Sequence, residues 1–127
     1  MEENKISKSI LAVDDEKVIL NLMELFLKRK FKECHFASNG KEALQLINDG
    51  IKIDIVLTDI SMPIMDGLEL QKRLEEICPA IPVIAITGHT EQVYLDKMNK
   101  QNFKKIFFKP IKKSDIEEII ELLKENN

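Results

Sequence analysis

The chain has 127 residues, of which 44% are hydrophobic and 32% charged, and its formal net charge is −3. This length suits one domain over residues 1–127, and the dispersed lysines and arginines exclude the basic footprint of a nucleic-acid binder. The polar start is no secretion signal, no apolar run approaches the ~18 residues of a membrane span, and the two cysteines form no disulfide framework. We therefore expect a cytoplasmic protein that binds neither membrane nor nucleic acid.

The predicted strands are apolar runs of five to seven residues, spaced along the whole chain. They cover residues 9–13, 33–37, 53–58, 81–87 and 104–108, and the run at 33–37 is the weakest. These runs are rich in isoleucine and valine and mostly lack strict alternation of apolar and polar residues. Such runs are typical of parallel strands that are covered on both faces.

The predicted helices lie between and after these runs, where apolar residues recur at helical spacing. In chain order the stripes are Val18, Leu22, Leu25 and Phe26 with the polar Arg29 at the end, then Ala43, Leu44 and Ile47, then Leu70, Leu74 and Ile77, then Val93, Tyr94 and Met98, then Ile116, Ile119, Ile120 and Leu123. We expect these stripes to pack against the sheet. Asp49-Gly50 ends the second helix, Asp66 caps the third, and Ser114 to Glu117 form a capping box for the fifth. The alternation indicates an α/β fold with a mainly parallel sheet.

Polar side chains follow four of the five predicted strands. Asp14 and Asp15 end the first strand, Asp59 the third, Thr87 the fourth and Lys109 the fifth. Because ligands of open parallel sheets bind at the carboxyl ends of the strands, we expect these five side chains to meet. Clustered carboxylates raise the cost of ionising one another, and Mg²⁺ removes that cost. A cation, an ammonium and a hydroxyl around one carboxylate also suit a phosphoryl group.

A structural interpretation of the acidic pair competes with the functional one. Asp14 or Asp15 could simply stabilise the amino terminus of the next helix through the helix dipole. For the pair alone the two interpretations are about even. The full set of three carboxylates, one hydroxyl and one ammonium, in this strand order, favours the functional interpretation.

The ordered motifs resemble those of one known family. The stretches "LTDISMPIMDG", "ITGHT" and "FFKP", together with the acidic pair, are similar to those of CheY-like receiver domains of bacterial response regulators. The resemblance covers residues 9–124. It implies a flavodoxin-like, three-layer α/β/α fold with five parallel strands in the order 2-1-3-4-5 and five helices.

The resemblance also implies roles for individual residues. Asp59 would be the phosphoacceptor, and Thr87 and Lys109 would contact the phosphoryl oxygens. Mg²⁺ would be held by Asp15 directly, by Asp14 partly through water, by Asp59, and by the backbone carbonyl of Ser61. The bond between Lys109 and Pro110 would be cis.

Other positions near the motifs have smaller expected roles. Gly67 and Pro63 would shape the loop after Asp59, and Gly88 would leave the phosphoryl site open. Ser61 and His89 occupy positions that tune the lifetime of the phosphoryl group in the family, although an inert His89 is favoured.

The fifth strand departs from the family pattern. Ile106 stands where relatives carry the aromatic residue that turns inward on activation. Phe107 and Phe108 are out of phase with it and are expected to be core. The aromatic part of the switch is therefore in doubt here, whereas the phosphorylation chemistry is not.

The implied partners are a histidine kinase or histidine phosphotransfer protein, docking near residues 17–26, and a downstream protein effector. The effector would bind the face formed by the fourth helix, fifth strand and fifth helix. Lys104 and Lys105 on this face have two interpretations of equal weight, which are recognition of the effector and protection of the edge strand against unwanted pairing. The protein would be a monomer or a phosphorylation-dependent dimer. It could be a stand-alone regulator, a relay, or a receiver module cut from a longer regulator or hybrid kinase.

Three rival interpretations remain open. A metal-dependent aspartyl-phosphate phosphatase would need a D-x-D motif after the first strand, but the chain has Asp14-Asp15-Glu16. A flavodoxin-like nucleotide binder would need a phosphate loop where these acids stand. A degenerate receiver that serves only as an interaction module is disfavoured by the complete acidic set and Lys109.

Overall fold

The computed structural model describes residues 5–88 and 91–125, with the side chain of residue 125 excluded. Strands and helices alternate along it. They are β1 (Ile6–Val13), α1 (Lys17–Leu27), β2 (Phe31–Ala37), α2 (Gly40–Asn48), β3 (Ile55–Asp59), α3 (Gly67–Ile77), β4 (Val83–Thr87), α4 (Gln92–Asn99), β5 (Lys105–Phe108) and α5 (Lys113–Glu125). Within the described ranges, no helix has the length and apolar character needed to cross a membrane.

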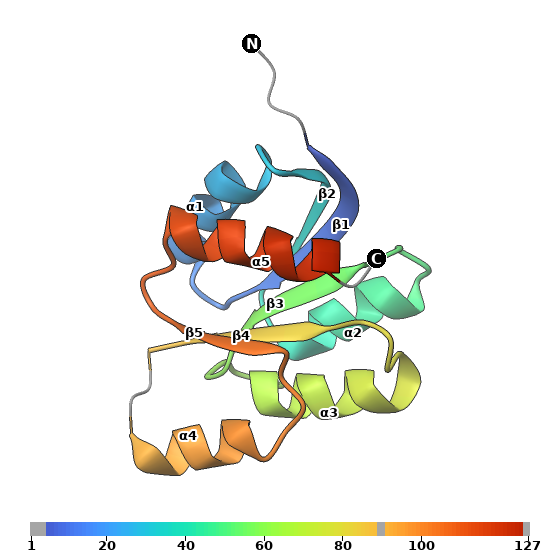
Figure 1. The fold of residues 1–127 in the computed structure, drawn as a ribbon. Helices are drawn as coiled ribbons and strands as arrows, with labels where there is room; N and C mark the ends of the chain where they lie inside the picture. Colours follow the sequence, from blue (N-terminus) through green and yellow to red (C-terminus); the bar gives the residue numbers. More distant parts are fainter. Residues whose placement is uncertain (1–4, 89–90, 126–127) are drawn as a thin grey trace.

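The five strands form one parallel sheet in the order β2-β1-β3-β4-β5, as the family resemblance predicted. Helices α1 and α5 cover one face of the sheet, and α2, α3 and α4 cover the other (Figure 1). The architecture is therefore the predicted three-layer α/β/α arrangement. Because all strands run the same way, their carboxyl ends share one edge of the sheet.

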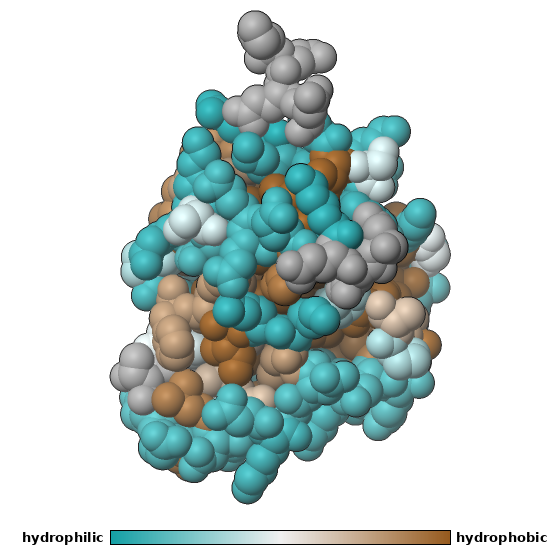
Figure 2. Space-filling view, in the orientation of Figure 1, coloured by the Kyte–Doolittle hydropathy of each residue, from teal (hydrophilic) through white to brown (hydrophobic). Residues whose placement is uncertain are grey.

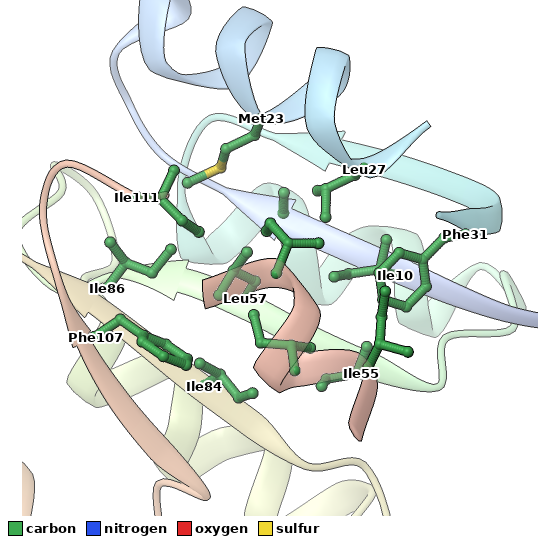
Figure 3. Packing of buried hydrophobic residues seen from close by; sticks show 14 of the residues in the cluster. Ile10, Met23, Leu27, Phe31, Ile55, Leu57, Ile84, Ile86, Phe107 and Ile111 are labelled. Carbon is green, nitrogen blue, oxygen red and sulfur yellow. The ribbon is translucent and has the colours of Figure 1, made fainter. Parts of the chain in front are cut away.

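Apolar side chains fill the space on both faces of the sheet. The larger cluster joins Ile10, Ile55 and Ile84 of the strands to Met23 and Leu27 of α1 (Figure 3). The predicted stripe of α5 also belongs to it, namely Ile116, Ile119, Ile120 and Leu123. A second cluster packs α2 and α3 against the other face, and a third packs α4 there. Coverage of both faces explains why the strand sequences do not alternate.

Local signals set several helix ends as predicted. The carboxylate of Asp66 accepts a hydrogen bond from the backbone N–H of Glu69 at 2.8 Å and so caps α3. Helix α2 ends at Asn48, and Gly50 adopts a positive φ of 94° just beyond it. The capping box predicted at Ser114 is wrong, because α5 begins at Lys113. Asp115 supplies the contact instead, and its carboxylate accepts a hydrogen bond from the N–H of Lys112 at 2.9 Å.

Of the stripe predicted for the first helix, Phe26 packs against the core cluster, but the other apolar residues do not. Val18 and Leu25 have exposed fractions of 76% and 67%, and Leu22 is also exposed. Met23 and Leu27 lie in the core instead. Both faces of α1 are apolar, so the sequence pattern alone did not determine which one the sheet covers. Helix α1 therefore presents an unusually apolar outer surface.

Three further expectations of burial are wrong. Ile77, at the end of α3, is half exposed, as is Val93 of α4. Phe108 has an exposed fraction of 46%, whereas Phe107 is in the core. Neighbouring strand residues face opposite sides of a sheet, so β5 can bury only one of its two phenylalanines on the α1–α5 side.

Candidate functional site

The carboxyl edge of the sheet brings together side chains from β1, β3, β4 and β5. Asp14 follows β1 directly, Asp59 ends β3, Thr87 ends β4, and Lys109 follows β5. Asp14 and Thr87 are fully buried, and Asp59 is nearly so. Asp15 is exposed, so it faces solvent while its neighbour Asp14 faces inward. The parallel strands thus deliver the predicted residues to one edge of the sheet.

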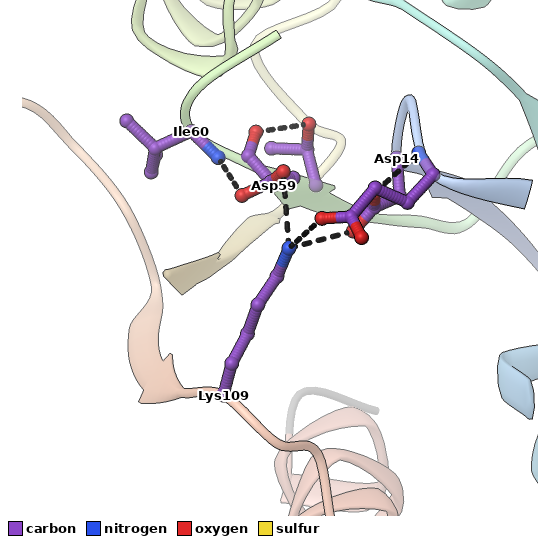
Figure 4. A network of polar contacts seen from close by, with 6 residues as sticks. Asp14, Asp59, Ile60 and Lys109 are labelled. Carbon is purple, nitrogen blue, oxygen red and sulfur yellow. Dashed lines mark hydrogen bonds and ion pairs between the residues drawn. The ribbon is translucent and has the colours of Figure 1, made fainter. Parts of the chain in front are cut away.

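Lys109 connects two of the carboxylates (Figure 4). Its Nζ atom lies 3.2 Å from Oδ2 of Asp59 and 3.1 Å from Oδ2 of Asp14. Glu16 lies at the margin, with Oε1 3.9 Å from the same nitrogen. Sequence reasoning did not include Glu16 in the site, although its position directly after the acidic pair was a usable signal.

The backbone around Asp59 holds its carboxylate in place. Oδ1 accepts a hydrogen bond from the N–H of Ile60 at 2.8 Å, and Oδ2 accepts one from the ammonium of Lys109. The Thr58 hydroxyl donates to the Asp59 carbonyl at 2.8 Å. On the first strand, Oδ1 of Asp14 accepts from the N–H of Glu16 at 2.9 Å. Both buried carboxylates are therefore oriented by local backbone donors.

Burial and neighbouring charges shift the pKa values of both Asp59 and Lys109. Burial, and then the charge of Asp14, raise the pKa of Asp59 above its ordinary value, although Lys109 acts in the opposite direction. For Lys109, burial works to lower the pKa, but the contacts with Asp14 and Asp59 outweigh it and the pKa is raised. The single positive charge of Lys109 therefore does not balance the carboxylates of Asp14, Asp15 and Asp59.

The donor set fits a divalent cation. Asp14, Asp15 and Asp59 each offer a carboxylate oxygen, and these atoms lie within 4.8 Å of one another. Hard oxygen ligands that leave room for water are those that Mg²⁺ prefers. The raised pKa of Asp59 points the same way, because an added cation would favour its ionised form.

Magnesium and pH should act on stability through this cluster. A carboxyl whose pKa is raised by folding binds its proton more tightly in the folded state. The free energy of unfolding of the metal-free protein should therefore fall as pH rises from the ordinary Asp range through the raised pKa of Asp59. Mg²⁺ at about a hundred times its dissociation constant should add about 2.7 kcal/mol at neutral pH.

Urea unfolding of the wild type and of Asp59→Asn, over a pH series with EDTA or with Mg²⁺, checks this expectation. The difference in stability between the two proteins isolates Asp59 from other titrating groups. A difference that does not change with pH without metal, or equal stabilisation of both proteins by Mg²⁺, would contradict it.

The remaining predicted positions are only partly described. Ser61 is exposed two residues after Asp59, and a Cβ on Gly88 would meet no atom of the described residues within 4 Å. The bond between Lys109 and Pro110 is cis, as predicted. His89 and Thr90 lie outside the described residues.

The position expected to hold a switching aromatic is occupied by a packed aliphatic residue. Ile106 is partly buried beside Ala85 and Met98, in the cluster under α4. Tyr94 of α4 packs against the same cluster. This contact joins α4 to β5 without an aromatic ring at position 106.

The loop after Asp59 is tightly packed and holds an unusual backbone conformation. The N–H of Gly67 donates to the carbonyl of Ile60 at 2.8 Å. Ile64 has a φ of 70°, which is uncommon for a β-branched residue, and the N–H of Met65 donates to the carbonyl of Pro63 at 2.7 Å around it. Ile64 is also 76% exposed. Nothing in the sequence pattern predicted this conformation.

Comparison with protein families finds one family model that matches most of the chain. Residues 10–121 match the model described as the response regulator receiver domain. The autoinducer 1 sensor kinase/phosphatase LuxN of Vibrio campbellii is 31% identical over 97 residues, which cover 76% of this chain and 11% of that protein. The uncharacterized transcriptional regulatory protein YesN of Bacillus subtilis is 35% identical over 122 residues, or 91% of this chain and 33% of YesN. The chain thus spans a third or less of these two relatives.

Solved structures share the fold over nearly the full chain. A CheY-like response regulator receiver domain protein from Methanospirillum hungatei has a TM-score of 0.85 and 28% identity, covering 94% of this chain and 96% of that one. A CheX-CheY-BeF3-Mg complex from Borrelia burgdorferi has a TM-score of 0.77 and 26% identity, covering 93% and 90%. The strand order and helix placement therefore match those of known receiver domains.

Proposed function

Because this chain belongs to the response regulator receiver domain family, we propose that it carries a two-component signal through phosphorylation of Asp59. The donor is a histidine kinase or a histidine phosphotransfer protein, and the chain catalyses only its own phosphorylation and dephosphorylation. The proposed unit is one receiver domain, whether stand-alone or part of a longer regulator or hybrid kinase. LuxN and YesN, which are longer, support the last two settings.

The observation that carries this proposal is the environment of Asp59. Its carboxylate is almost completely buried, 3.2 Å from the Lys109 ammonium, and grouped with Asp14 and Asp15. Lys109 alone does not offset the three carboxylates. A bound phosphoryl group would add further negative charge, so the site needs a cation beside it.

Phosphoryl transfer then depends on positioning and charge neutralisation. An oxygen of the Asp59 carboxylate attacks the phosphorus of the phosphohistidine, and an O–P bond forms as the N–P bond breaks. The electron pair of the N–P bond returns to the imidazole nitrogen. Lys109 balances charge on the transferred oxygens, and the Thr87 hydroxyl donates to one of them.

Asp14, Asp15, Asp59 and the Ser61 carbonyl would hold Mg²⁺, which supplies positive charge to the phosphoryl oxygens. The structural neighbour that contains both BeF3 and Mg supports this assignment. Asp59 must be ionised to attack, and a cation opposes the burial that raises its pKa.

The proposed output surface is the face formed by α4, β5 and α5. Val93 and Phe108 are exposed there, and Figure 2 shows hydrophobic residues gathered over β5 between the hydrophilic surfaces of the helices. Movement of Thr87 toward the phosphoryl group would shift the segment after β4 and with it α4. A downstream protein effector, or a second copy in a phosphorylation-dependent dimer, would bind this changed face.

Beryllofluoride with Mg²⁺ tests the switch without covalent chemistry. Backbone amide shifts of ¹⁵N-labelled protein should change at Asp59, Thr87 and Lys109, and then along α4 and β5. The Asp59→Asn variant should show no such response. Shifts confined to the carboxyl edge of the sheet, with none in α4 or β5, would contradict the proposed output face.

Helix α1 is the proposed docking place for the phosphodonor. Val18, Leu22 and Leu25 form an exposed apolar strip on the helix that follows Asp14 and Asp15. Such a strip is suited to packing against a helix of the donor. Docking there would bring a phosphohistidine close to the acidic cluster of Asp14, Asp15 and Asp59.

The substitution Leu25→Glu should slow phosphoryl transfer from phosphorylated histidine phosphotransfer domains by about tenfold or more, since it places a charge in an apolar contact. Transfer from acetyl phosphate should be unchanged, because that small donor needs no docking surface. Ile77→Glu, which also changes an exposed aliphatic residue but on α3, is the matched control. Equal loss in both variants, or loss with acetyl phosphate, would count against docking on α1.

A further inference from the structure

A second surface, which shares α4 with the proposed output face, lies between α3 and α4. An open groove of about 650 Å³ runs there, and its lining includes the loop after Asp59 and the end of α4. The two helices lie next to each other beneath the sheet in Figure 1. The Gln101 side-chain amide joins them, because its nitrogen donates to the Leu68 carbonyl at 3.0 Å and to Oε1 of the buried Gln71 at 2.7 Å. This network makes the groove a built feature of the fold.

Apolar side chains line the end of the groove nearest to the phosphorylation site. Ile64 is 76% exposed there, and Met65 and Leu68 are partly buried beside it. Ile64 itself has the positive φ of this loop. The next residue, Met65, is anchored because its carbonyl accepts a hydrogen bond from the N–H of Gly40 at 3.0 Å. An exposed, well-anchored aliphatic group of this kind is suited to contact with an apolar side chain.

The ionic groups of the groove leave an excess of positive charge. Two acidic residues line the groove: Asp66, which caps α3, and Glu69, which pairs with Arg73 at 2.8 Å. Three lysines line both walls, Lys72 from α3 and Lys97 and Lys100 from α4. In residues 5–88 and 91–125 none of these lysines forms an ion pair, and the Nζ atom of Lys97 lies over the Tyr94 ring, 5.7 Å from its centroid.

We propose that the α3–α4 groove binds an acidic segment of a partner protein, which places an apolar side chain on Ile64 and carboxylates against Lys72, Lys97 and Lys100. The cations stand on two walls, and Lys97 and Lys100 lie about one helical turn, or ~5 Å, apart. This spacing matches carboxylates distributed along a peptide better than the compact charge of a single small anion. The combination of apolar and cationic lining likewise favours a peptide over a purely ionic ligand.

All of the contacts above are made without a phosphoryl group, so the groove is present in the unmodified protein. Binding can therefore be measured on the unmodified protein and on Asp59→Asn. Failure of phosphorylation and failure of this proposal are consequently distinguishable.

The test is a selection from a random 12-residue peptide library displayed on phage. The library is first depleted on the triple variant Lys72→Glu, Lys97→Glu and Lys100→Glu, and is then selected on the wild type. We expect enriched peptides with several Asp or Glu residues around one large apolar residue. A synthetic peptide of the consensus sequence should shift amides at Ile64, Leu68 and Lys97, and should lose about tenfold or more in affinity for the triple variant.

A matched triple variant at exposed lysines away from the groove, Lys32→Glu, Lys41→Glu and Lys52→Glu, changes the net charge equally and should bind the peptide within about twofold of the wild type. Circular dichroism checks that both triple variants are folded. The proposal is overturned if the enriched peptides show no acidic excess, or if their shifts fall on α1 or β5. It is also overturned if a single-stranded RNA of equal charge binds the same groove as tightly as the peptide.

Discussion

Incubation with acetyl phosphate and Mg²⁺ is expected to add the mass of one phosphoryl group to the wild-type protein and none to the Asp59→Asn variant. Asp59 is the carboxylate that is nearly buried, oriented by the N–H of Ile60, and in contact with Lys109. The amide introduced by this substitution would keep the size of the side chain but could not form the acyl phosphate. The expected effect on phosphorylation is therefore complete loss.

Intact-mass spectrometry measures this result, and hydroxylamine should remove the added mass because acyl phosphates react with it. EDTA should prevent the addition, since the acidic cluster needs a cation beside the incoming charge. Asp49→Asn, at an exposed residue after α2, is the control and should be phosphorylated like the wild type. The assignment of Asp59 fails if its Asn variant gains the same hydroxylamine-sensitive mass.

Gly67→Ala is expected to lower the free energy of unfolding by about 3 kcal/mol, the upper end of the usual cost of overpacking. Gly67 is buried at the start of α3, and a Cβ there would collide with the carbonyl oxygen of Asp59. It would also lie 3.0 Å from the Cα of Ile60. These neighbours are backbone atoms, so the loop can accept the methyl group only by moving away from the sheet.

The same movement would displace the backbone that orients Asp59, so phosphorylation by acetyl phosphate should also slow in the Gly67→Ala variant. Urea unfolding compares it with Gly88→Ala, where a Cβ meets no atom within 4 Å and the expected change is below about 0.5 kcal/mol. A loss of less than about 1 kcal/mol in Gly67→Ala would mean that the loop is free to adjust.

The order and type of the elements could be predicted from the sequence because they depend on local patterns. The five parallel strands and five helices occur in the predicted order, with strand bounds that differ by a few residues at their starts. The strand starts were less predictable, since β1 begins at Ile6, and polar residues precede its apolar core. Pairing with β2 extends the strand beyond what its own composition indicates.

The site residues were predictable for a related reason. In a parallel sheet the last residue of every strand lies at the same edge, so polar residues after separate apolar runs must converge there. The actual contacts needed the tertiary structure, because Lys109 meets Asp14 and Asp59 across 95 and 50 positions of the chain. No local pattern specifies that one ammonium contacts both carboxylates, or that Glu16 lies beside them.

By itself the sequence determined the α/β architecture, the carboxyl edge that gathers the charged residues, and the family to which they point. Only the tertiary structure decided which side of α1 is exposed, which phenylalanine of β5 is buried, and that α3 and α4 leave a lysine-lined groove between them. The physical reason is that periodicity reports which residues share a face of an element. Whether that face meets water depends on neighbours that are distant in sequence.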